Sequence, residues 1–346
     1  MFEVAVIGAG PSGAIAAKTC AENGLKTVLV EKETLPRDKP CGGLLSPSVL
    51  KLVRKSFGEI PKDAVETPIE EMISSLPSYE FRQSVVGVSV YRRFFDYWLT
   101  QEAEKAGSVL RKGFLRSLLQ KEDHVDLKLQ KGNLPEEIKA KYVVGADGVG
   151  SAVCSSLVPR LKRQLLQAYQ TYAVGGQLPK NTAYLFFPIK EPQVTYFWMI
   201  PKKQVVVLGV GGLPPIDLKK LMRNFLSKMK KQYSFKGFLR HEAYPIPMFS
   251  PTNVALGKKR AFLVGDAASL ANPFTGEGIF NSLKSGKLAS EAIIEHFDEP
   301  FQVFKAYERK MKNLLTELNE AYTFYTQYQS LNDARRQDIL KTILQN

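Results

Sequence analysis

The sequence of 346 residues has few cysteines and no long run of apolar residues. Its cysteines, Cys20, Cys41 and Cys154, are too few and too far apart for a disulfide framework or a zinc site, so we expect no bound metal. No apolar run reaches the roughly 18 residues that a membrane-spanning helix needs. The apolar N-terminus has Glu3 where a signal peptide carries basic residues. We therefore expect a cytoplasmic protein.

Acidic residues are scarce in the middle of the chain. Between Arg160 and Arg260 there are 18 lysines and arginines but only 3 acidic residues, whereas the whole chain has a net charge of +14. The remainder is therefore close to neutral. A basic segment attracts nucleic acid, an anionic membrane or an acidic protein. Because this one contains no recognisable nucleic-acid-binding module, we expect no nucleic-acid partner.

With 44% hydrophobic and 24% charged residues, the composition is that of a folded globular protein. Strand-like apolar runs and helical patterns alternate near both ends of the chain, while residues 160–258 are rich in strand-like runs. We therefore predict an α/β fold, a Rossmann-like domain with an inserted antiparallel sheet. The expected ranges are 1–72, 85–158 and 259–298 for the first domain, 73–84 and 159–258 for the inserted domain, and 299–346 for C-terminal helices.

A glycine motif, Gly8-x-Gly10-x-x-Gly13, follows the first predicted strand and opens a helix. Gly8 permits a tight turn, Gly10 lets the backbone approach a pyrophosphate, and Gly13 lets the helix pack on the strand. Glu31 ends the second strand, where a carboxylate can bind ribose hydroxyls. These features predict dinucleotide binding. The candidate ligands are Gly8, Gly10, Pro11, Ser12, Gly13, Glu31 and Lys32.

Two later segments favour FAD over NAD. Asp147 and Asp266 each follow a predicted strand, where a carboxylate can accept hydrogen bonds from the ribityl hydroxyls of a flavin. A helix that begins near Gly278 would direct its positive end at the flavin. Either Asp alone could belong to a simple turn, but the three motifs in this order predict FAD. The candidate ligands here are Asp147, Gly265, Asp266, Pro273, Gly276, Gly278 and Ile279.

Together these motifs resemble the flavoprotein class of para-hydroxybenzoate hydroxylase and, within it, the geranylgeranyl reductase family, over about residues 1–300. The resemblance implies a para-hydroxybenzoate hydroxylase-like fold. It also implies that Arg92 contacts FAD, because Arg92-Arg-Phe-Phe-Asp96 matches the family's Arg-x-x-Phe-Asp pattern. Alternatively, Arg92 is a solvated charge at a helix start. The chain looks short at its C-terminal end for this family, which implies a more open pocket.

The loop from Pro40 to Pro47 contains Cys41-Gly42-Gly43, where paired glycines let the backbone pass close to a planar ligand. It is similar to the Cys-Gly-Gly loop at the active site of geranylgeranyl reductases. The resemblance implies that Cys41 and Gly42 contact the flavin and that Gly43 contacts the substrate. A tight turn with an incidental cysteine is the alternative.

The segment Tyr196-Phe-Trp198-Met-Ile200-Pro201-Lys alternates, so that every second side chain points to one face of a sheet. It resembles the family's Tyr-x-Trp-x-Phe-Pro-Lys substrate motif, with Ile200 in place of Phe. It also resembles the Trp-x-Trp-x-Ile-Pro box of flavin halogenases, from which it departs at Tyr196. An ordinary core strand would show the same alternation. The candidate substrate-binding residues are Gly43, Tyr196, Trp198, Ile200 and Pro201.

The resemblance implies an FAD-dependent oxidoreductase that transfers a hydride from flavin N5 to a carbon–carbon double bond of a geranylgeranyl-type lipid or related isoprenoid. Cys41, Tyr196 or water could supply the proton, so Cys41 and Tyr196 are the candidate catalytic residues. The alternatives are a flavin-dependent halogenase or aromatic monooxygenase, and a flavoprotein that acts on or chaperones a partner protein. No second dinucleotide fingerprint is present, so we expect an external electron donor, a nicotinamide or an acidic redox protein.

Residues 217–233 predict a helix with an apolar side and a basic side. Such a helix can lie on an anionic membrane, which would place the protein peripherally at the inner face of the membrane. The basic side could instead attract an acidic electron carrier. In the third interpretation the apolar side packs in the core and the lysines are simply solvated.

Overall fold

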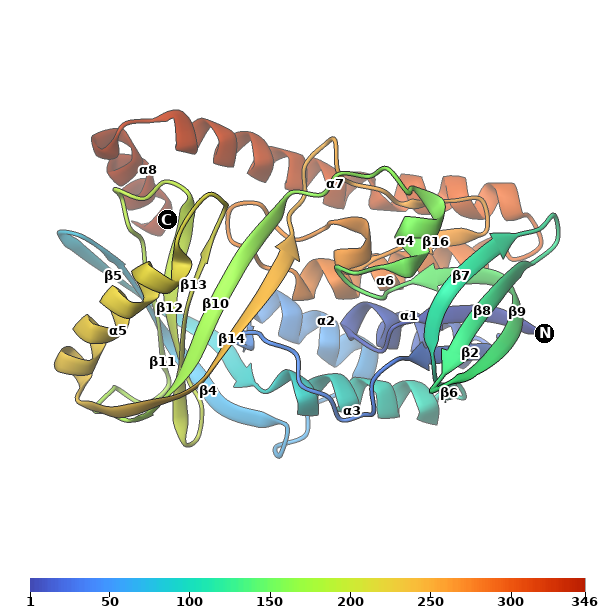
Figure 1. The fold of residues 1–346 in the computed structure, drawn as a ribbon, viewed down its shortest axis with the longest axis horizontal. Coiled ribbons are helices and arrows are strands. Elements are labelled where there is room, and N and C mark those ends of the chain that lie inside the picture. The colour runs from blue at the N-terminus through green and yellow to red at the C-terminus, as the bar shows by residue number, and fades with distance from the viewer. Residues whose placement is uncertain (346) are drawn as a thin grey trace.

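The computed structural model describes residues 1–345 and contains two eight-stranded sheets (Figure 1). The first sheet is built on parallel strands whose central paired residues, such as 4–7 and 28–30, are apolar and buried, as expected for strands covered on both faces. Its order is β15 (Gly257–Lys258), β16 (Ala261–Leu263), β9 (Leu134–Gly145), β1 (Phe2–Ile7), β2 (Thr27–Glu31) and β6 (Val109–Lys112), with β7 (Phe114–Gln120) and β8 (Val125–Lys131) forming an antiparallel extension from β9.

Helices α1 (Pro11–Glu22), α3 (Arg92–Lys105) and α6 (Ile279–Glu295) pack together beside this sheet, and the short α4 (Ala152–Leu157) lies near β7. The contact between α1 and α6 is made by backbone. A Cβ atom at Gly286 would lie 2.2 Å from the carbonyl oxygen of Ser12. Helices from the two ends of the chain therefore pack tightly against each other.

The second sheet lies beside the first and combines strands from two parts of the chain (Figure 1). Its order is β14 (Phe235–Pro247), β10 (Leu165–Gly175), β13 (Val205–Gly212), β12 (Val194–Pro201), β11 (Thr182–Phe186), β4 (Val65–Leu76), β5 (Tyr79–Val90) and β3 (Leu44–Leu45).

Two features of the second sheet differ from expectation. The sheet is not wholly antiparallel, because β11 joins the hairpin of β4 and β5 in the parallel direction. That hairpin is also longer than the expected range 73–84. The two strands pair from Leu76 with Tyr79 at the turn to Val65 with Val90 at the far end, so the pairing extends beyond residues 73–84 on both strands.

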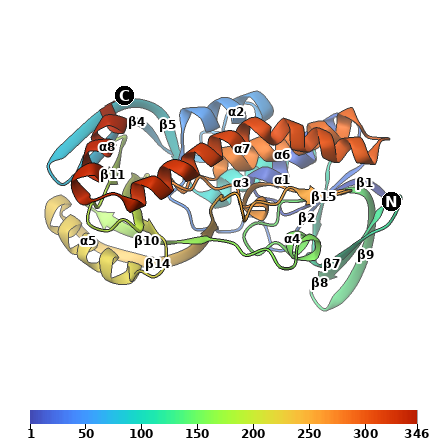
Figure 2. The same ribbon diagram turned by 90° about the horizontal axis from the view of Figure 1, so that it is seen from above.

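Helix α5 (Leu218–Tyr233) covers the outer face of the second sheet, away from the first sheet (Figure 1, Figure 2). Its apolar side is buried, and the ring centroids of Phe225 and Phe197 are 4.5 Å apart. The expectation that this side could lie in a membrane is therefore wrong, since sheet packing already occupies it. The exposed residues of the other side include Lys219, Lys220, Arg223, Lys228, Lys230 and Lys231.

Helix α7 (Pro300–Ser330) extends along the molecule from the first sheet to the second, and α8 (Asp333–Gln345) follows it (Figure 2). Near its start, the hydroxyl of Tyr307 donates to the carbonyl of Leu263 at 2.8 Å. Near its end, the amide of Gln329 donates to the carbonyl of Pro192 at 3.3 Å. Within residues 1–345, no helix combines the length and apolar character required to cross a membrane. Helix α2 (Pro47–Phe57) lies between α6 and β5.

Candidate functional site

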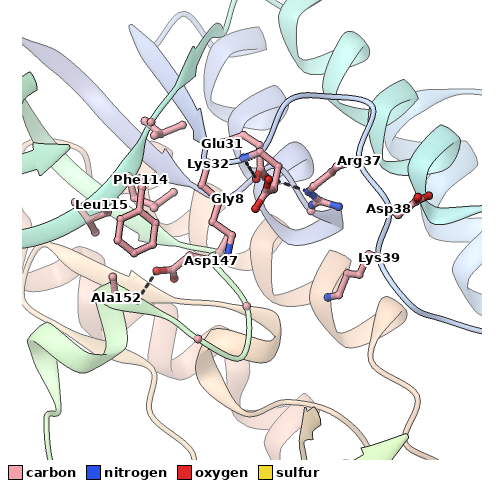
Figure 3. Close-up of a pocket in the computed structure, with 18 of the residues that line it drawn as sticks. Gly8, Glu31, Lys32, Arg37, Asp38, Lys39, Phe114, Leu115, Asp147 and Ala152 are labelled. Carbon is pink, nitrogen blue, oxygen red and sulfur yellow. Dashed lines mark hydrogen bonds and ion pairs between the residues drawn. The ribbon is translucent and has the colours of Figure 1, made fainter. Parts of the chain in front are cut away.

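A cavity opens at the carboxyl ends of β1, β2 and β9, the edge at which parallel sheets bind ligands (Figure 3). Two glycines shape it by bringing backbone into direct contact. A Cβ atom at Gly8 would lie 2.4 Å from the carbonyl oxygen of Ala146, and one at Gly13 would lie 1.8 Å from that of Gly8. Gly8 also has a φ of +103°, which favours glycine.

The N-terminus of α1 faces this cavity, and no side chain caps it. Gly10 stands at the cap position and leaves the first helical N–H groups open. Such an end binds anions through its N–H groups and its positive dipole. The glycine turn and the uncapped helix therefore fit a pyrophosphate. Among the ligands expected from the glycine motif and the second strand, Gly8, Gly10, Glu31 and Lys32 line this cavity, whereas Gly13 lies behind Gly8.

Glu31 is held in position by its surroundings. Its carboxylate accepts hydrogen bonds from the backbone N–H groups of Ala9 at 2.8 Å and Glu33 at 3.0 Å. Arg37 approaches it, with 3.5 Å between Nε and Oε2, and Figure 3 shows the two side chains turned toward each other. Arg37 is a site residue that sequence reasoning missed, because a lone arginine in a Pro-rich loop carries no distinguishing signal.

Arg92 and Asp96 form a buried pair at the start of α3. Arg92 donates from Nε and Nη2 to the two oxygens of Asp96 at 2.6 and 2.8 Å, and Arg37 Nη1 donates to the same carboxylate at 3.1 Å. Burial acts to raise the pKa of Asp96, but the two guanidinium groups outweigh it and hold that pKa below its usual range. Arg92 is therefore a buried, fixed cation rather than the solvated charge of the alternative interpretation.

A second cavity continues from the first and shares six wall residues with it. Its wall brings together the thiol of Cys41, the guanidinium of Arg92 and the start of α6, whose N-terminus at Gly278 also has no side-chain cap. Asp266 lies there too and pairs with Lys39 at 3.3 Å. The expected ligands on this wall are Gly10, Pro11, Ser12, Cys41, Arg92, Asp266, Gly276, Gly278 and Ile279.

Four expected flavin ligands are placed differently, and one of them, Gly42, is a wall residue of neither cavity. Asp147 lines the first cavity, but its oxygens accept hydrogen bonds from the hydroxyl of Ser151 at 2.5 Å and the N–H of Ala152 at 2.7 Å. Burial raises the pKa of Asp147, and these donors oppose the rise. Asp147 thus caps the start of α4. Gly265 and Pro273 lie behind the walls of the two cavities.

The Cys41–Gly43 loop packs directly on β12. A Cβ atom at Gly42 would lie 2.6 Å from Cδ1 of Ile200 and 3.4 Å from Nε1 of Trp198. The expected alternation along β12 is confirmed, because Trp198 and Ile200 face this loop while Phe197 packs under α5. Cys41 itself is partly exposed, and its sulfur accepts the N–H of Gly43 at 3.3 Å.

The phenol of Tyr196 is engaged elsewhere. Its hydroxyl donates to the carbonyl of Thr275 at 2.7 Å, and its ring contacts Phe187 and Trp198 with centroids 5.8 and 6.1 Å apart. Burial, with Glu277 and Cys41 adding to it, raises the pKa of Tyr196. A proton from this hydroxyl would have to leave a hydrogen bond, whereas Cys41 is a wall residue of the second cavity.

Lys202 is a second residue to which sequence reasoning gave no role. It ends the motif on β12, and its side chain is buried. Nζ donates to the carbonyls of Gly42 at 2.9 Å and Val90 at 2.7 Å. Burial lowers the pKa of Lys202 to about 7. The available signal was its place as the last residue of the segment that resembles the Tyr-x-Trp-x-Phe-Pro-Lys motif.

No group of three or more His, Cys, Asp or Glu side chains in residues 1–345 is arranged to hold a metal ion. The site consists of a glycine turn, the uncapped N-termini of α1 and α6, the Arg92–Asp96 pair and the loop that carries Cys41.

Comparison with known proteins agrees with these features. A family model described as an FAD binding domain matches residues 1–169. Digeranylgeranylglycerophospholipid reductase 1 of Methanopyrus kandleri is 31% identical over 316 residues, which cover 86% of this chain and 82% of that protein. The chloroplastic geranylgeranyl diphosphate reductase of Arabidopsis thaliana is 28% identical over 85% of this chain, and the match spans 66% of the plant protein, just under two thirds of its length.

Solved structures share the fold. A geranylgeranyl bacteriochlorophyll reductase-like protein from Thermoplasma acidophilum superposes with a TM-score of 0.86 at 21% identity, covering 96% of this chain and 89% of that one. The flavin-dependent halogenase CmlS has a TM-score of 0.75 at 20% identity, covering 94% and 63%. At such identities the likeness concerns the fold alone. The cofactor of this chain is FAD, which the family match and the residues of both cavities fit.

Proposed function

Because this chain belongs to the geranylgeranyl reductase family, we propose that it reduces carbon–carbon double bonds of a polyprenyl lipid of the geranylgeranyl type. The observation that carries the proposal is the meeting of two motifs. Cys41, the first residue of the Cys41–Gly43 loop, lines the second cavity, and Gly42 packs against Trp198 and Ile200 of β12. An apolar surface and a thiol thus adjoin the flavin end of the cofactor site.

We assign the phosphate end of FAD to the turn at Gly8 and Gly10 and the N-terminus of α1, and the ribose of the adenosine to Glu31. The flavin end belongs with Arg92, Asp266 and the N-terminus of α6. The uncapped N-terminus of α6 favours negative charge at the flavin end, as that of α1 does at the phosphate end. Reduced FAD supplies the hydride.

The second requirement is a proton for the other alkene carbon, and we assign its delivery to the Cys41 thiol. Cys41 is a wall residue of the second cavity, and its side chain is partly exposed. The hydroxyl of Tyr196 is already donated to Thr275, so we assign Tyr196 to the apolar surface together with Trp198 and Ile200. The protein's part is then to hold an isoprenoid chain against this surface, exclude water and present one proton.

The test is anaerobic reduction of the FAD-loaded protein followed by addition of a geranylgeranyl lipid. We expect reoxidation by the lipid and a product two mass units heavier per double bond reduced. Cys41→Ala should retain FAD and lose at least about 100-fold in rate, the usual contribution of a positioned proton donor. Cys154→Ala, which removes a buried thiol that lines neither cavity, is the control. Full activity in the Cys41 variant would assign the proton to another source, and reoxidation by dioxygen and halide alone would reject the reductase.

We also propose that electrons come from an external donor, a nicotinamide or an acidic redox protein, and that the protein works in the cytoplasm in peripheral contact with an anionic membrane surface. The exposed lysines of α5 support both contacts through attraction. Since the apolar side of α5 is buried, the membrane contact would be electrostatic and sensitive to salt.

A further inference from the structure

Lys202, at the end of β12, is a buried cation whose presence the proposed chemistry leaves unexplained. Its exposed fraction is 5%, and within the described residues no carboxylate lies within ion-pair distance of it. Burying an amine costs free energy unless it is well hydrogen-bonded. The two acceptors that Lys202 does have are both backbone carbonyls, those of Gly42 and Val90. A solvent-exposed lysine would have sufficed if the position needed only a charge.

The two carbonyls belong to segments that carry groups of the second cavity. Gly42 directly follows Cys41, and Val90 ends β5 two residues before Arg92. The two segments also contact each other, because the N–H of Val90 donates to the carbonyl of Gly43 at 2.8 Å. A single side chain from the second sheet therefore ties together the loop of the thiol and the entry to α3.

We propose, resting on the proposed function, that Lys202 is a positioning residue: by donating to Gly42 and Val90 it fixes the backbone that holds the Cys41 thiol in the second cavity. The packing around it leaves no room for another arrangement. A Cβ atom at Gly43 would lie 2.8 Å from Nζ of Lys202 and 2.0 Å from the carbonyl oxygen of Val90. Gly43 has a φ of +70°, so this loop conformation itself depends on glycine.

The charged and titratable groups that face Lys202 are Cys41 in the loop, Glu66 on β4 and Tyr91, whose ring centroid is 5.3 Å from Nζ. Burial lowers the pKa of Lys202 to about 7, against the opposing effects of Cys41 and Glu66. An ammonium group and a neutral amine both have enough N–H groups for two carbonyls. The tie is therefore kept through the titration and is lost only when the side chain is replaced.

The experiment compares hydrogen–deuterium exchange in FAD-loaded Lys202→Met with that in Lys203→Met, a control at the exposed neighbouring lysine. We expect backbone exchange in residues 41–45 and 88–92 to accelerate at least about tenfold in Lys202→Met, because the variant loses both hydrogen bonds that Nζ donates to these segments. Exchange elsewhere, and FAD content, should match the control. With a prenyl substrate, kcat should fall while KM stays unchanged, since the apolar surface of β12 remains.

Unchanged exchange in both segments would overturn the proposal, as would an equal acceleration throughout the chain, which indicates general destabilisation. If Lys202→Met does not fold, Lys202→Gln, whose shorter side chain cannot span both acceptors, decides by the same comparison. Exchange and FAD content need no prenyl substrate. A wild-type protein that reduces no prenyl lipid would therefore reject the proposed function and leave the test of Lys202 intact.

Discussion

Individual glycines determine how closely other groups approach strand β12. The indole of Trp198 lies over Gly209 on the neighbouring strand β13, where a Cβ atom would be 2.1 Å from Cζ2. Gly42 leaves similar room on the other side, next to Ile200. The tryptophan is thus held between two positions without side chains. Gly209 and Gly211 do not complete a second dinucleotide motif, and the structure gives Gly209 this packing role instead.

Gly209→Ala should therefore push Trp198 out of place. We expect the free energy of unfolding to fall by about 1–3 kcal/mol, the usual cost of overpacking, and prenyl reduction to slow while FAD is retained. Urea unfolding measures the loss of stability, the rate of prenyl reduction measures the loss of activity, and the flavin absorbance of the purified variant measures the FAD that is retained. Gly237→Ala is the matched control, since a Cβ atom there would meet nothing nearer than 3.8 Å. Equal stability of the two variants would contradict the packing role of Gly209.

The lowered pKa of Lys202 predicts how stability depends on pH. The unfolded chain binds the lysine proton up to about pH 10.4, whereas the folded protein releases it near pH 7. Between these values the unfolded state holds more protons, so this contribution to stability rises with pH by at most about 1.4 kcal/mol per pH unit.

Lys202→Met should abolish that rise. The measurement is the free energy of unfolding of wild type minus variant at about pH 6.5 and about pH 8.5, where the difference should grow with pH. Other groups with raised pKa values, such as Cys20, act equally in both proteins and cancel. A difference independent of pH would show that Lys202 keeps its proton in the folded protein.

At the scale of elements, α5 shows why an amphipathic pattern has two meanings. Its apolar residues are buried against β10, β13 and β14, so the helix is part of a domain core. Its basic side is nevertheless unshielded and belongs to the segment that carries the excess charge of the molecule. The sequence pattern predicts the two sides correctly, but it does not say whether protein or lipid covers the apolar one.

Reversing charge on α5 tests the electrostatic contact. Lys228→Glu with Lys231→Glu should weaken flotation with anionic vesicles roughly thirtyfold, since each lysine near such a surface contributes about 1 kcal/mol. Lys121→Glu with Lys131→Glu, at exposed positions around the β7–β8 hairpin, makes the same change in net charge and is the control. Equal binding by both variants at low salt would place the contact elsewhere.

The elements that sequence predicted best are those with strong local signals. The strand and glycine turn around Gly8, the helix after them and the alternation at Trp198 follow from period and turn chemistry. The strand β14 was missed because Phe235–Pro247 mixes charged, aromatic and proline residues, and only its pairing with β10 through ten residue pairs makes it a strand. Strands β7 and β8 were also missed, although β8 alternates between buried apolar and more exposed polar residues, a signal that the sequence did offer.

Within the site, the sequence predicted the residues that belong to a local motif and missed those that reach it through tertiary contact. Gly8 and Cys41 have neighbours that identify them. The roles of Arg37 and Lys202 follow from their contacts with Asp96 and Gly42, which are distant from them in sequence. Asp147 was assigned to the ligand and does line the first cavity, but its carboxylate also accepts hydrogen bonds from the first N–H groups of α4.

At the scale of the whole molecule, FAD should act as part of the fold. Its proposed contacts come from β1, the loop after β2, α3 and the segment before α6, and an ion pair between Lys39 and Asp266 joins the second and last of these. A ligand present at 100 times its Kd stabilises the folded state by about 2.7 kcal/mol.

Removal of FAD should therefore lower the unfolding midpoint, and added FAD should restore it in a concentration-dependent way. Thermal unfolding of the stripped protein with increasing FAD measures this. Arg92→Met should weaken the response to FAD, because its guanidinium lines the second cavity. A midpoint that does not change with FAD concentration would contradict the assignment of the cofactor site.

The place of β16 in the first sheet has a consequence for synthesis of the chain. Ala261–Leu263 pairs with β9, so the half of the site that contains Asp266 and Gly278 meets the half that contains Gly8 only after more than two thirds of the residues have been made. Contacts so distant in sequence form slowly, and the edge of β9 stays open to wrong partners meanwhile. The nascent chain thus has to be protected from aggregation before it can hold its cofactor, which makes late folding a cost of building one site from both ends of a polypeptide.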